Sequence, residues 1–328
     1  MKTIRWGIAG PGNIANKFAK AVKNVEGATL AAVASTSEER GSAFAQKYDI
    51  PKIFTSYEAM ATSDEVDAVY VATPHPFHKG CAEIFLKAGK HVLCEKPVCI
   101  NVAQAKALHN CAKENGVFLM EAMWTKFLPA IKEVQNIVNS GEIGEIRGIT
   151  ADFCYNSTPR EEAKIFRNDM AGGSLLDVGI YGLQFVALFM GYEPEAVNSM
   201  CQIGGGVDLH TSVTMKYSSG AIATITSALN VAKPASAYIY GSDGYIFVPT
   251  FYGATEAYVY KNGEERRIDA PSIGDGFEEE IYEACACIRE GRTESDIHPM
   301  DDSIALLEQM DAIRKCHNIK YPFEGEEN

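Results

Sequence analysis

The chain has 328 residues, of which 46% are hydrophobic and 22% are charged, a composition typical of globular proteins. This length suffices for about two domains of ordinary size. The formal net charge of −13 disfavours nucleic acid and anionic membrane surfaces as partners, because both are themselves negatively charged.

The chain shows no sign of a membrane or secretory segment. No uninterrupted apolar run reaches the roughly 18 residues that a transmembrane helix needs. The segment after Met1 and Lys2 predicts a strand with a charge inside it rather than a signal peptide. The nine cysteines have neither C-x-x-C nor zinc spacing, so we expect reduced, mostly buried thiols, no metal site and a cytoplasmic location.

Residues 1–122 alternate short apolar runs with amphipathic stretches. The expected strands are Thr3–Ala9, Thr29–Ser35, Lys52–Phe54, Ala68–Ala72, His91–Cys94 and Phe118–Ala122. The expected helices are Ala15–Val22, Glu38–Tyr48, Phe77–Ala88 and Ala103–Glu114. Strands that are apolar throughout favour a parallel sheet covered on both faces, and the alternation predicts a doubly wound α/β Rossmann domain.

Residues 123–328 have a different pattern, which predicts a second, α+β domain. After a helix expected at Trp124–Ser140, alternating strands follow one another at Ile146–Tyr155, Ala196–Ile203, Thr211–Tyr217, Ala221–Ala228 and Tyr238–Gly241. Short turns between such strands predict an open, mostly antiparallel sheet. Two helices, Glu278–Glu290 and Asp302–Cys316, are expected to close the chain.

A glycine motif follows the first expected strand. Gly10, Gly12 and Ala15 fit G-x-G-x-x-A between a strand and a helix, the context in which this motif binds a dinucleotide. Asn13 and Ile14 lie where the helix begins, whose amide groups can bind a pyrophosphate. The alternative is a tight turn that binds nothing.

The end of the second expected strand lacks the acidic residue with which NAD binders usually hold the ribose. Ser35 and Thr36 stand there, with Arg40 nearby, and hydroxyls with an arginine suit a 2′-phosphate. The sequence therefore favours NADP over NAD. Alternatively, Arg40 is only a solvated helix residue and Glu38 or Glu39 reaches the ribose.

Glu95, Lys96 and Pro97 stand at the end of the fifth expected strand. The carboxyl ends of parallel strands line the ligand crevice, so Lys96 is expected to point toward the nicotinamide end of a cofactor. A cation there stabilises an alkoxide developing on a substrate oxygen. Taken alone, the motif is equally a turn with a surface ion pair.

These motifs resemble the Gfo/Idh/MocA oxidoreductase family over essentially the whole chain. The likeness rests on the glycine loop, on Thr73-Pro74-His75 with His78, on Glu95-Lys96-Pro97, and on the segment from Gly172 to Tyr181. Residues 93–97 and 118–125 are most similar to the dihydrodiol dehydrogenase branch of that family.

The resemblance implies roles for three side chains. Many members carry a histidine as acid/base where this chain has Tyr181, and in the dihydrodiol branch the tyrosine is assigned the proton transfer. Lys96 is then expected to polarise the substrate oxygen and to acidify the phenol, while Asp177 orients the substrate. Asp177 and Tyr181 are four apart, which on a helix places them on one face.

The resemblance also implies contacts to the cofactor and a partner. The expected cofactor contacts further include Thr73, Pro74, His75, His78, Glu95, Trp124 and Arg167. Trp124 either covers the nicotinamide as a lid or packs in the core between domains. Arg167 either contacts the cofactor or substrate or lies on the surface. Relatives bury the open face of the second sheet against another subunit, so a homodimer is expected.

The expected function is hydride transfer between NADP(H) and a CH–OH group of a sugar, a polyol or a trans-dihydrodiol. Two alternatives remain open. One is a family variant with tightly bound nicotinamide and no net redox change, for example a glycosidase-like enzyme. The other is a non-catalytic nicotinamide-binding sensor, whose expected signature, loss of Lys96, Asp177 or Tyr181, is not seen here.

Overall fold

The computed structural model describes residues 2–157 and 163–324, which form two compact units. Unit 1 comprises the chain up to Trp124 together with Ser272–Ile304, and unit 2 comprises Thr125–Pro271 and the chain from Ala305 on. The expected division at residue 122 lies close to the first boundary. Residues 272–304, which we expected in the second domain, cluster instead with unit 1, because a return of the chain leaves no local signature in the sequence.

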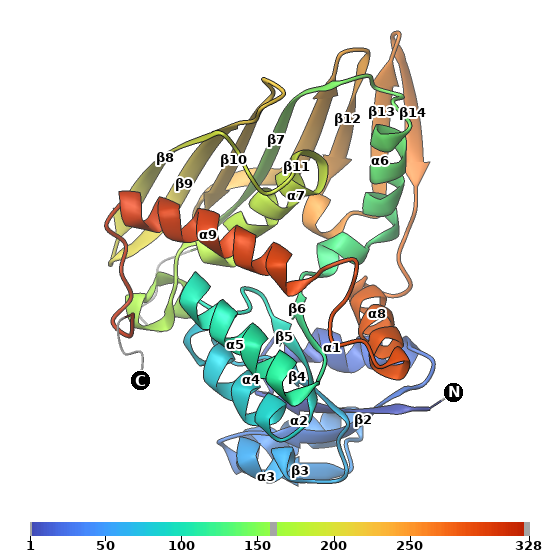
Figure 1. The fold of residues 1–328 in the computed structure, drawn as a ribbon, viewed down its shortest axis with the longest axis vertical. Coiled ribbons are helices and arrows are strands. Elements are labelled where there is room, and N and C mark those ends of the chain that lie inside the picture. The colour runs from blue at the N-terminus through green and yellow to red at the C-terminus, as the bar shows by residue number, and fades with distance from the viewer. Residues whose placement is uncertain (1, 158–162, 325–328) are drawn as a thin grey trace. The chain divides into compact units, whose positions relative to one another are not determined.

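Unit 1 is built on a six-stranded parallel sheet in the order β3-β2-β1-β4-β5-β6 (Figure 1). The strands are β1 (Ile4–Ala9), β2 (Ala28–Ala34), β3 (Lys52–Phe54), β4 (Ala68–Val71), β5 (His91–Glu95) and β6 (Leu119–Ala122). Every residue of β4 and β6 is buried, as expected for parallel strands with helices on both faces. The predicted doubly wound α/β fold is confirmed.

The helices of unit 1 are α1 (Ala15–Ala21), α2 (Glu38–Tyr48), α3 (Tyr57–Ala61), α4 (His78–Lys87), α5 (Val102–Asn115) and α8 (Phe277–Glu290). Helix α5 shows why they begin and end where they do. The Asn101 side chain accepts a hydrogen bond from the Gln104 amide at its start, and Gly116 ends it in the left-handed conformation. Helix α3 is too short for hydrophobic periodicity to reveal, and the sequence analysis missed it.

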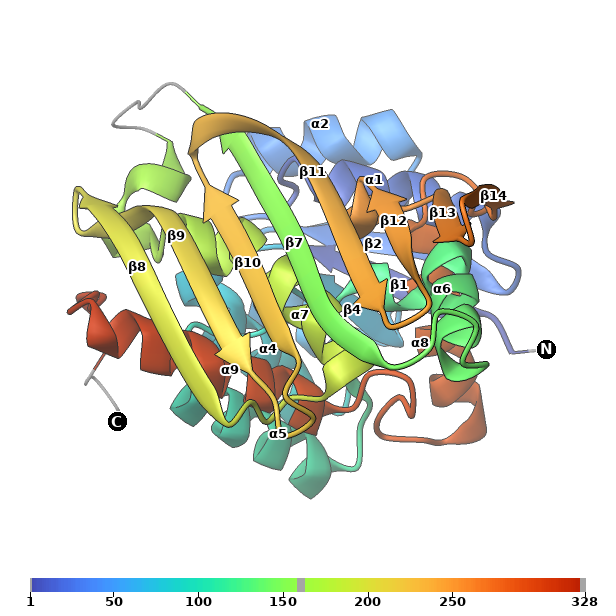
Figure 2. The same ribbon diagram turned by 90° about the horizontal axis from the view of Figure 1, so that it is seen from above.

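Unit 2 contains an eight-stranded sheet in the order β14-β13-β12-β11-β7-β10-β9-β8 (Figure 2). Its strands are β7 (Ile146–Asn156), β8 (Ala196–Gly204), β9 (Val207–Lys216), β10 (Ile222–Ala228), β11 (Asn230–Gly241), β12 (Gly244–Pro249), β13 (Glu256–Lys261) and β14 (Glu264–Asp269). All neighbours pair antiparallel except β7 and β10, which are parallel. The predicted open, mostly antiparallel sheet is confirmed.

Several elements of unit 2 differ from the sequence-based expectation. The helix expected at Trp124–Ser140 is divided into a 3₁₀ turn, Trp124–Phe127, and helix α6, Pro129–Asn139. Pro129 forces the residue before it, Leu128, into an extended conformation, which breaks the helix. Strand β11 begins at Asn230 rather than at Tyr238, and β12, β13 and β14 were missed. Strand β14 is exposed on both faces and so lacks the alternation that marks a strand.

Helix α7 (Ile180–Met190) packs on β7 and β10, and α6 packs on α7, β13 and β14. Together with the turns before α7, Asn168–Met190 is long and apolar enough on average to cross a membrane. It is not an uninterrupted apolar run, because Asp177 lies within it. In addition, 78% of its most apolar window is buried inside the structure, as for a core helix. The last helix, α9, runs from Met300 to Cys316.

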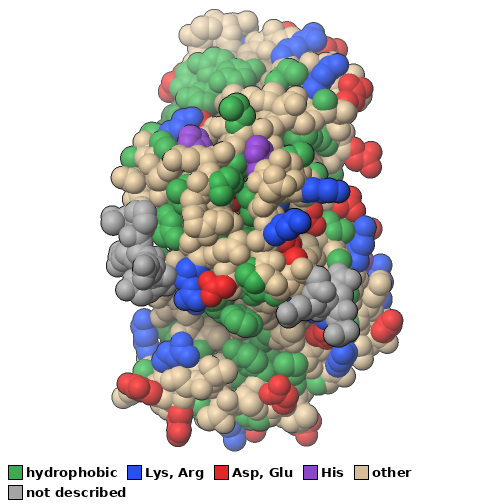
Figure 3. Space-filling view, turned by 90° about the vertical axis from the view of Figure 1, so that its left-hand side faces the viewer, with side chains coloured by type: hydrophobic (Ala, Val, Ile, Leu, Met, Phe, Trp, Pro, Cys, Tyr) green, Lys and Arg blue, Asp and Glu red, His purple; other side chains and the backbone are tan. Residues whose placement is uncertain are grey.

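The structure also shows the state of the cysteines and the distribution of charged side chains over one face. All nine cysteines are free, and seven of them are buried, as expected for reduced thiols that serve as small core residues. Acidic and basic side chains are interspersed over the face of the molecule in Figure 3. The net negative charge therefore forms no single acidic field on that face.

Candidate active site

The glycine loop of unit 1 follows β1 directly. Gly10 has a φ of +91°, a conformation that favours glycine, and its amide donates to the Ala34 carbonyl at 3.0 Å. A Cβ atom on Gly10 would lie 3.1 Å from the Ala72 carbonyl oxygen, just beyond β4. The strand order reverses between β1 and β4, so the loop lies at the switch point where doubly wound sheets bind ligands.

Asn16 stabilises this loop, a role that the sequence analysis did not identify. Its side-chain nitrogen donates to the carbonyl oxygens of Gly12, at 3.0 Å, and Asn13, at 3.2 Å. Its side-chain oxygen accepts hydrogen bonds from Lys47 and Tyr48 of α2, both at 2.7 Å. Helix α2 therefore holds the first turn of α1 in place, while Gly12 and Asn13 themselves are exposed.

The turn after β2 carries the residues expected at a 2′-phosphate. Ser35 is buried, and its hydroxyl accepts a hydrogen bond from the Ser37 amide at 3.1 Å. The Ser37 hydroxyl in turn accepts from the Arg40 amide at 3.3 Å and so caps α2. Thr36 and Arg40 are exposed, whereas Ser35 is largely engaged in forming the turn.

The segment after β4 contains a buried polar atom without a hydrogen-bond partner among the described residues, the hydroxyl oxygen of Thr73. Pro74 and His75 beside it are half-exposed. The ring of His78 faces the Pro97 carbonyl at 2.7 Å from Nδ1 and the Thr73 carbonyl at 2.8 Å from Nε2. Burial lowers the pKa of His78. With both nitrogens engaged and an exposure of 1%, His78 links two loops and can act on a cofactor only through them.

The Lys96 turn follows β5, and the Lys96–Pro97 peptide bond is cis. Glu95 is buried and accepts a hydrogen bond from the Tyr70 hydroxyl and one, at 3.2 Å, from the Lys96 amide. Burial raises the pKa of Glu95, against the effect of these hydrogen bonds. Glu95 is therefore a buried anchor of the turn, and Lys96 itself is half-exposed.

Glu121, at the end of β6, holds the other side of this turn. Its Oε1 accepts from the Val98 amide at 2.8 Å, and its Oε2 accepts from the Ser303 hydroxyl at 2.7 Å and contacts His298 Nε2 at 3.1 Å. All three side chains are buried. Burial by itself would raise the pKa of Glu121, but the interactions with His298, Ser303 and the Val98 amide outweigh it and lower that pKa.

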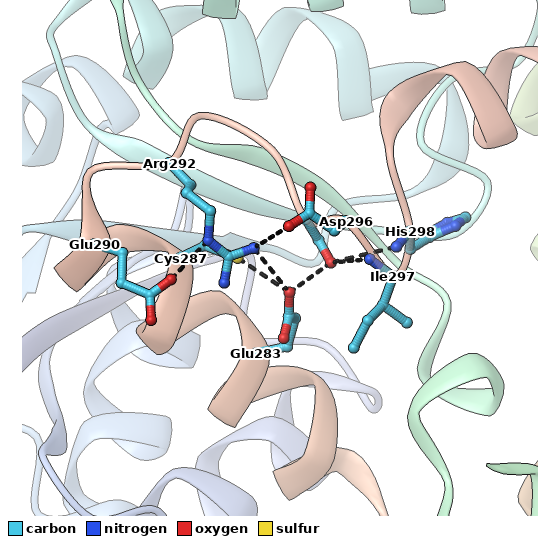
Figure 4. A network of polar contacts seen from close by, with 8 residues as sticks. Glu283, Cys287, Glu290, Arg292, Asp296, Ile297 and His298 are labelled. Carbon is cyan, nitrogen blue, oxygen red and sulfur yellow. Dashed lines mark hydrogen bonds and ion pairs between the residues drawn. The ribbon is translucent and has the colours of Figure 1, made fainter.

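The loop that follows α8 places His298 (Figure 4). The Ser295 hydroxyl accepts from the amides of Ile297, at 3.0 Å, and His298, at 3.2 Å, and donates to Glu283 of α8 at 2.7 Å. Arg292 of this loop bridges Glu290, the last residue of α8, and Asp296. The segment Ser272–Ile304 thus supports the Lys96 turn from within unit 1, which explains why it belongs there.

We expect Glu121→Gln to lower the free energy of unfolding by about 1–3 kcal/mol near neutral pH, because the amide leaves buried donors unpaired. The folded-state pKa of Glu121 is lowered, so the ionised carboxylate adds stability above its unfolded pKa of about 4.3 and loses it as the pH falls through the folded value. Denaturant titrations across this range should show the parent–variant difference shrinking in acid. An equal difference at every pH would contradict this account of the network.

In unit 2, Asp177 lies in a π-helical turn, Leu175–Gly179, that precedes α7. The expectation of a continuous α-helical spacing from Asp177 to Tyr181 is therefore wrong, because the π turn is wider than an α turn. Asp208 fixes the start of this turn: its Oδ2 accepts from the Ser174 hydroxyl at 2.6 Å and the Leu175 amide at 2.7 Å. Such π turns frequently occur at functional sites.

Aromatic rings surround Tyr181, which is 8% exposed. Its ring centroid lies 5.7 Å from that of Phe153 and 5.8 Å from that of Tyr252, and these two rings stack at 4.1 Å. The Tyr155 hydroxyl donates to Asp177 Oδ2 at 2.8 Å. The sequence analysis missed Tyr252, which lies in a short 3₁₀ turn, Phe251–Gly253, without any motif.

Trp124 and Arg167, which were also predicted to contact the cofactor, each contact residues of their own unit. In unit 1, Trp124 packs against Phe277 with ring centroids 5.0 Å apart, and the Lys17 ammonium lies 5.2 Å from the Trp124 ring. In unit 2, Arg167 forms an ion pair with Asp169. Unit 1 thus carries every predicted cofactor contact except Arg167, and unit 2 carries Arg167, Asp177 and Tyr181.

Both parts of the chain are similar to known proteins. Residues 4–123 match an oxidoreductase family with an NAD-binding Rossmann fold, and residues 131–247 match a GFO/IDH/MocA C-terminal domain. Trans-1,2-dihydrobenzene-1,2-diol dehydrogenase of Mus musculus is 34% identical, over 97% of this chain and 98% of that protein. A 3-ketoreductase from Actinomadura kijaniata, in complex with NADP and TDP-benzene, has a TM-score of 0.87 at 27% identity and covers 96% of this chain and 98% of its own. An aldose-aldose oxidoreductase from Caulobacter crescentus, complexed with glycerol, has a TM-score of 0.89 at 26% identity, covering 97% and 98%.

Proposed function

The chain belongs to the Gfo/Idh/MocA family of oxidoreductases, and we propose that it transfers a hydride between NADP(H) and a CH–OH group of a sugar, a polyol or a trans-dihydrodiol. One observation carries the proposal. The Gly10 loop, Thr73 and Lys96 follow β1, β4 and β5, three adjacent parallel strands of unit 1. Their carboxyl ends form the crevice where such sheets bind dinucleotides.

The residues of this crevice fit a nicotinamide dinucleotide. Gly10 lies so close to the Ala72 carbonyl that a side chain would collide there, and Gly12 is exposed without a side chain, so the backbone of the loop can approach a pyrophosphate. The Thr73 hydroxyl, which has no hydrogen-bond partner within residues 2–157 and 163–324, offers a buried hydrogen-bonding group beside them. Gly10, Gly12, Asn13 and Ile14 would hold the pyrophosphate, and Thr73, Pro74, His75 and Trp124 the remainder of the molecule. When bound, the nicotinamide supplies or accepts the hydride.

We propose that NADP is preferred over NAD because Thr36 and Arg40 stand exposed where the ribose of the adenosine is expected. A charge-assisted hydrogen bond is worth about 1.5–3 kcal/mol, so Arg40→Ala should weaken NADPH binding about 10–100-fold and leave NADH binding nearly unchanged. Fluorescence titration of both cofactors measures this. Lys23→Ala, another exposed cation of unit 1, is the matched control. Equal losses for the two cofactors would contradict a 2′-phosphate contact.

Three side chains of this chain act on the substrate in the proposed reaction. Tyr181 exchanges a proton between its phenolic oxygen and the substrate oxygen. Lys96 stabilises negative charge that develops on the substrate through its ammonium group. Asp177 accepts a hydrogen bond from a neighbouring hydroxyl of the substrate and so fixes which carbon reacts.

The substrate class follows from the surroundings of Tyr181. Phe153, Tyr252 and Tyr155 form an apolar wall that suits a ring, whereas Asp177 suits a hydroxyl on that ring. The dehydrogenase from Mus musculus is named for a cyclic diol, and the Caulobacter enzyme for aldoses. A panel of aldoses, polyols and trans-dihydrodiols, followed at the absorbance band of reduced nicotinamide, distinguishes these classes. Binding of NADPH without turnover of any of them would contradict the proposal.

A closed redox cycle is the second candidate, and the similarity to the aldose-aldose oxidoreductase favours it. In that case one sugar is oxidised and another reduced while the cofactor stays bound. Nicotinamide that co-purifies through gel filtration, with turnover that needs no added NADP, would distinguish this cycle from an ordinary dehydrogenase.

We propose further that the protein is a homodimer that pairs through the sheet of unit 2. The face that α7 does not cover, seen in Figure 2, carries stacked aromatic rings on β11, β12 and β13: Tyr238, Tyr240, Tyr245, Phe247, Tyr258 and Tyr260. Tyr240 is 40% exposed and Tyr245 36%, in a chain whose other sheet is covered. Sedimentation equilibrium measures the mass in solution, and a monomer at micromolar concentration would contradict the proposal.

A further inference from the structure

We infer that Tyr155 is a positioning residue of the proposed reaction, whose hydroxyl holds the Asp177 carboxylate in the orientation that the substrate needs. The inference rests on the proposed function, because it assigns Tyr155 a role through Asp177. The Tyr155 hydroxyl lies 2.8 Å from Asp177 Oδ2, within ordinary hydrogen-bond distance.

The two residues come from different elements of unit 2. Tyr155 stands near the end of β7, a central strand that pairs with β10 on one side and with β11 on the other. Asp177 stands in the π turn, where its own amide donates a long hydrogen bond, 3.4 Å, to the Gly173 carbonyl. The side-chain hydrogen bond therefore joins the carboxylate in the π turn to a strand of the sheet.

The Tyr155 hydroxyl is suited to donate a hydrogen bond to Asp177 at every working pH. Burial and the adjacent Asp177 carboxylate raise the pKa of Tyr155, so the phenol stays protonated at any pH at which an enzyme works. A neutral donor of this kind stabilises the ionised form of the carboxyl group. The Tyr155 hydroxyl binds Oδ2 and thereby restrains the orientation of the Asp177 carboxylate. Asp177 is half-exposed, so its carboxylate remains accessible to a ligand.

The chain contains a matched pair that serves as control. Tyr258 donates to Glu256 Oε2 at 3.0 Å, and both residues lie on β13. This pair has the same donor and acceptor types but no residue of the proposed reaction. A general effect of removing a tyrosine–carboxylate hydrogen bond would appear in both variants, whereas positioning of Asp177 would appear only in Tyr155→Phe.

The test begins without substrate or turnover. Tyr155→Phe keeps the ring beside Phe153, whose centroid lies 6.5 Å away, and removes only the hydroxyl. In the full-length protein with isotope-labelled aspartate carboxyl groups, NMR should show Asp177 titrating at a pH about one unit higher in this variant, because the donor to its ionised form is gone. Tyr258→Phe should leave that titration unchanged. An unshifted Asp177 in Tyr155→Phe would overturn the inference.

Kinetics then test whether the bond serves the reaction. We expect Tyr155→Phe to raise KM about 5–20-fold with little change in kcat. The acid limb of the pH profile of kcat/KM should shift to higher pH by the same amount as the NMR titration of Asp177. Adding Tyr155→Phe to Asp177→Asn should cost nothing further, since the two residues act as one unit. Additive losses would overturn the positioning role. Absence of turnover in the parent protein contradicts the proposed function. The NMR titration of Asp177 needs no turnover, so it tests the Tyr155–Asp177 hydrogen bond separately.

Discussion

Replacing Tyr181 by phenylalanine is expected to lower kcat about 10²–10⁴-fold, the usual contribution of a positioned general acid or base. The substitution removes the phenolic oxygen that exchanges the substrate proton and leaves the ring among Phe153 and Tyr252. Cofactor affinity should stay within about twofold, because every proposed cofactor contact but Arg167 belongs to unit 1. Steady-state turnover and NADPH titration on the same preparation measure both quantities.

The matched control is Tyr217→Phe. Tyr217 is also a buried tyrosine of unit 2, and its hydroxyl donates to the Gly191 carbonyl at 3.2 Å rather than to anything near Asp177. This variant is expected to keep near-parental kcat. Comparable losses in the two variants would indicate a general packing defect. Near-parental turnover in Tyr181→Phe would remove Tyr181 from the mechanism.

Lys96→Met is the second large effect, with an expected loss of about 10²–10³-fold in kcat, as for removal of one group that stabilises a developing oxyanion. Methionine keeps an unbranched side chain of similar length after β5 while it removes the positive charge. Glu95, Glu121 and His78 hold the turn through its backbone and through Pro97 and Val98, so its shape should persist. Single-turnover kinetics with saturating NADPH separate this loss from any change in cofactor binding.

Lys87→Met provides the corresponding control, since Lys87 is an exposed lysine of unit 1 whose partner is Glu83. Loss of its charge should leave the rate of the chemical step unchanged. The role of Lys96 would be contradicted if the rate in Lys96→Met matched that of the parent. It would equally be contradicted if the loss appeared entirely as weaker NADPH binding.

The features that the sequence predicted are those with a local signature. The expected strands match all six strands of unit 1, because most of them are buried parallel strands that are apolar on both faces, although the edge strand β3 is exposed. The loop at Gly10 was predictable because its chemistry depends on adjacent glycines between a strand and a helix. The predicted family and fold are confirmed by the family models that match residues 4–123 and 131–247.

The features that the sequence could not predict depend on contacts between distant segments. The return of Ser272–Ile304 to unit 1, the Asp177–Tyr155 bond and the placing of Tyr252 beside Tyr181 join residues with no shared motif. Strand β14 lies at the edge of its sheet and is polar on both faces, so alternation does not mark it. The π turn before α7 changed the expected spacing of Asp177 and Tyr181, because helical periodicity assumes a regular α-helix.

The most direct test of the central claim is isotope transfer from substrate to cofactor. A candidate cyclic diol or sugar carrying deuterium on its carbinol carbon is incubated with the protein and NADP, and the cofactor is then analysed by mass spectrometry. The account predicts that the deuterium appears in reduced NADP and that Tyr181→Phe slows its appearance. If the substrate is converted while the deuterium never reaches the nicotinamide, hydride transfer to NADP is not the reaction of this protein.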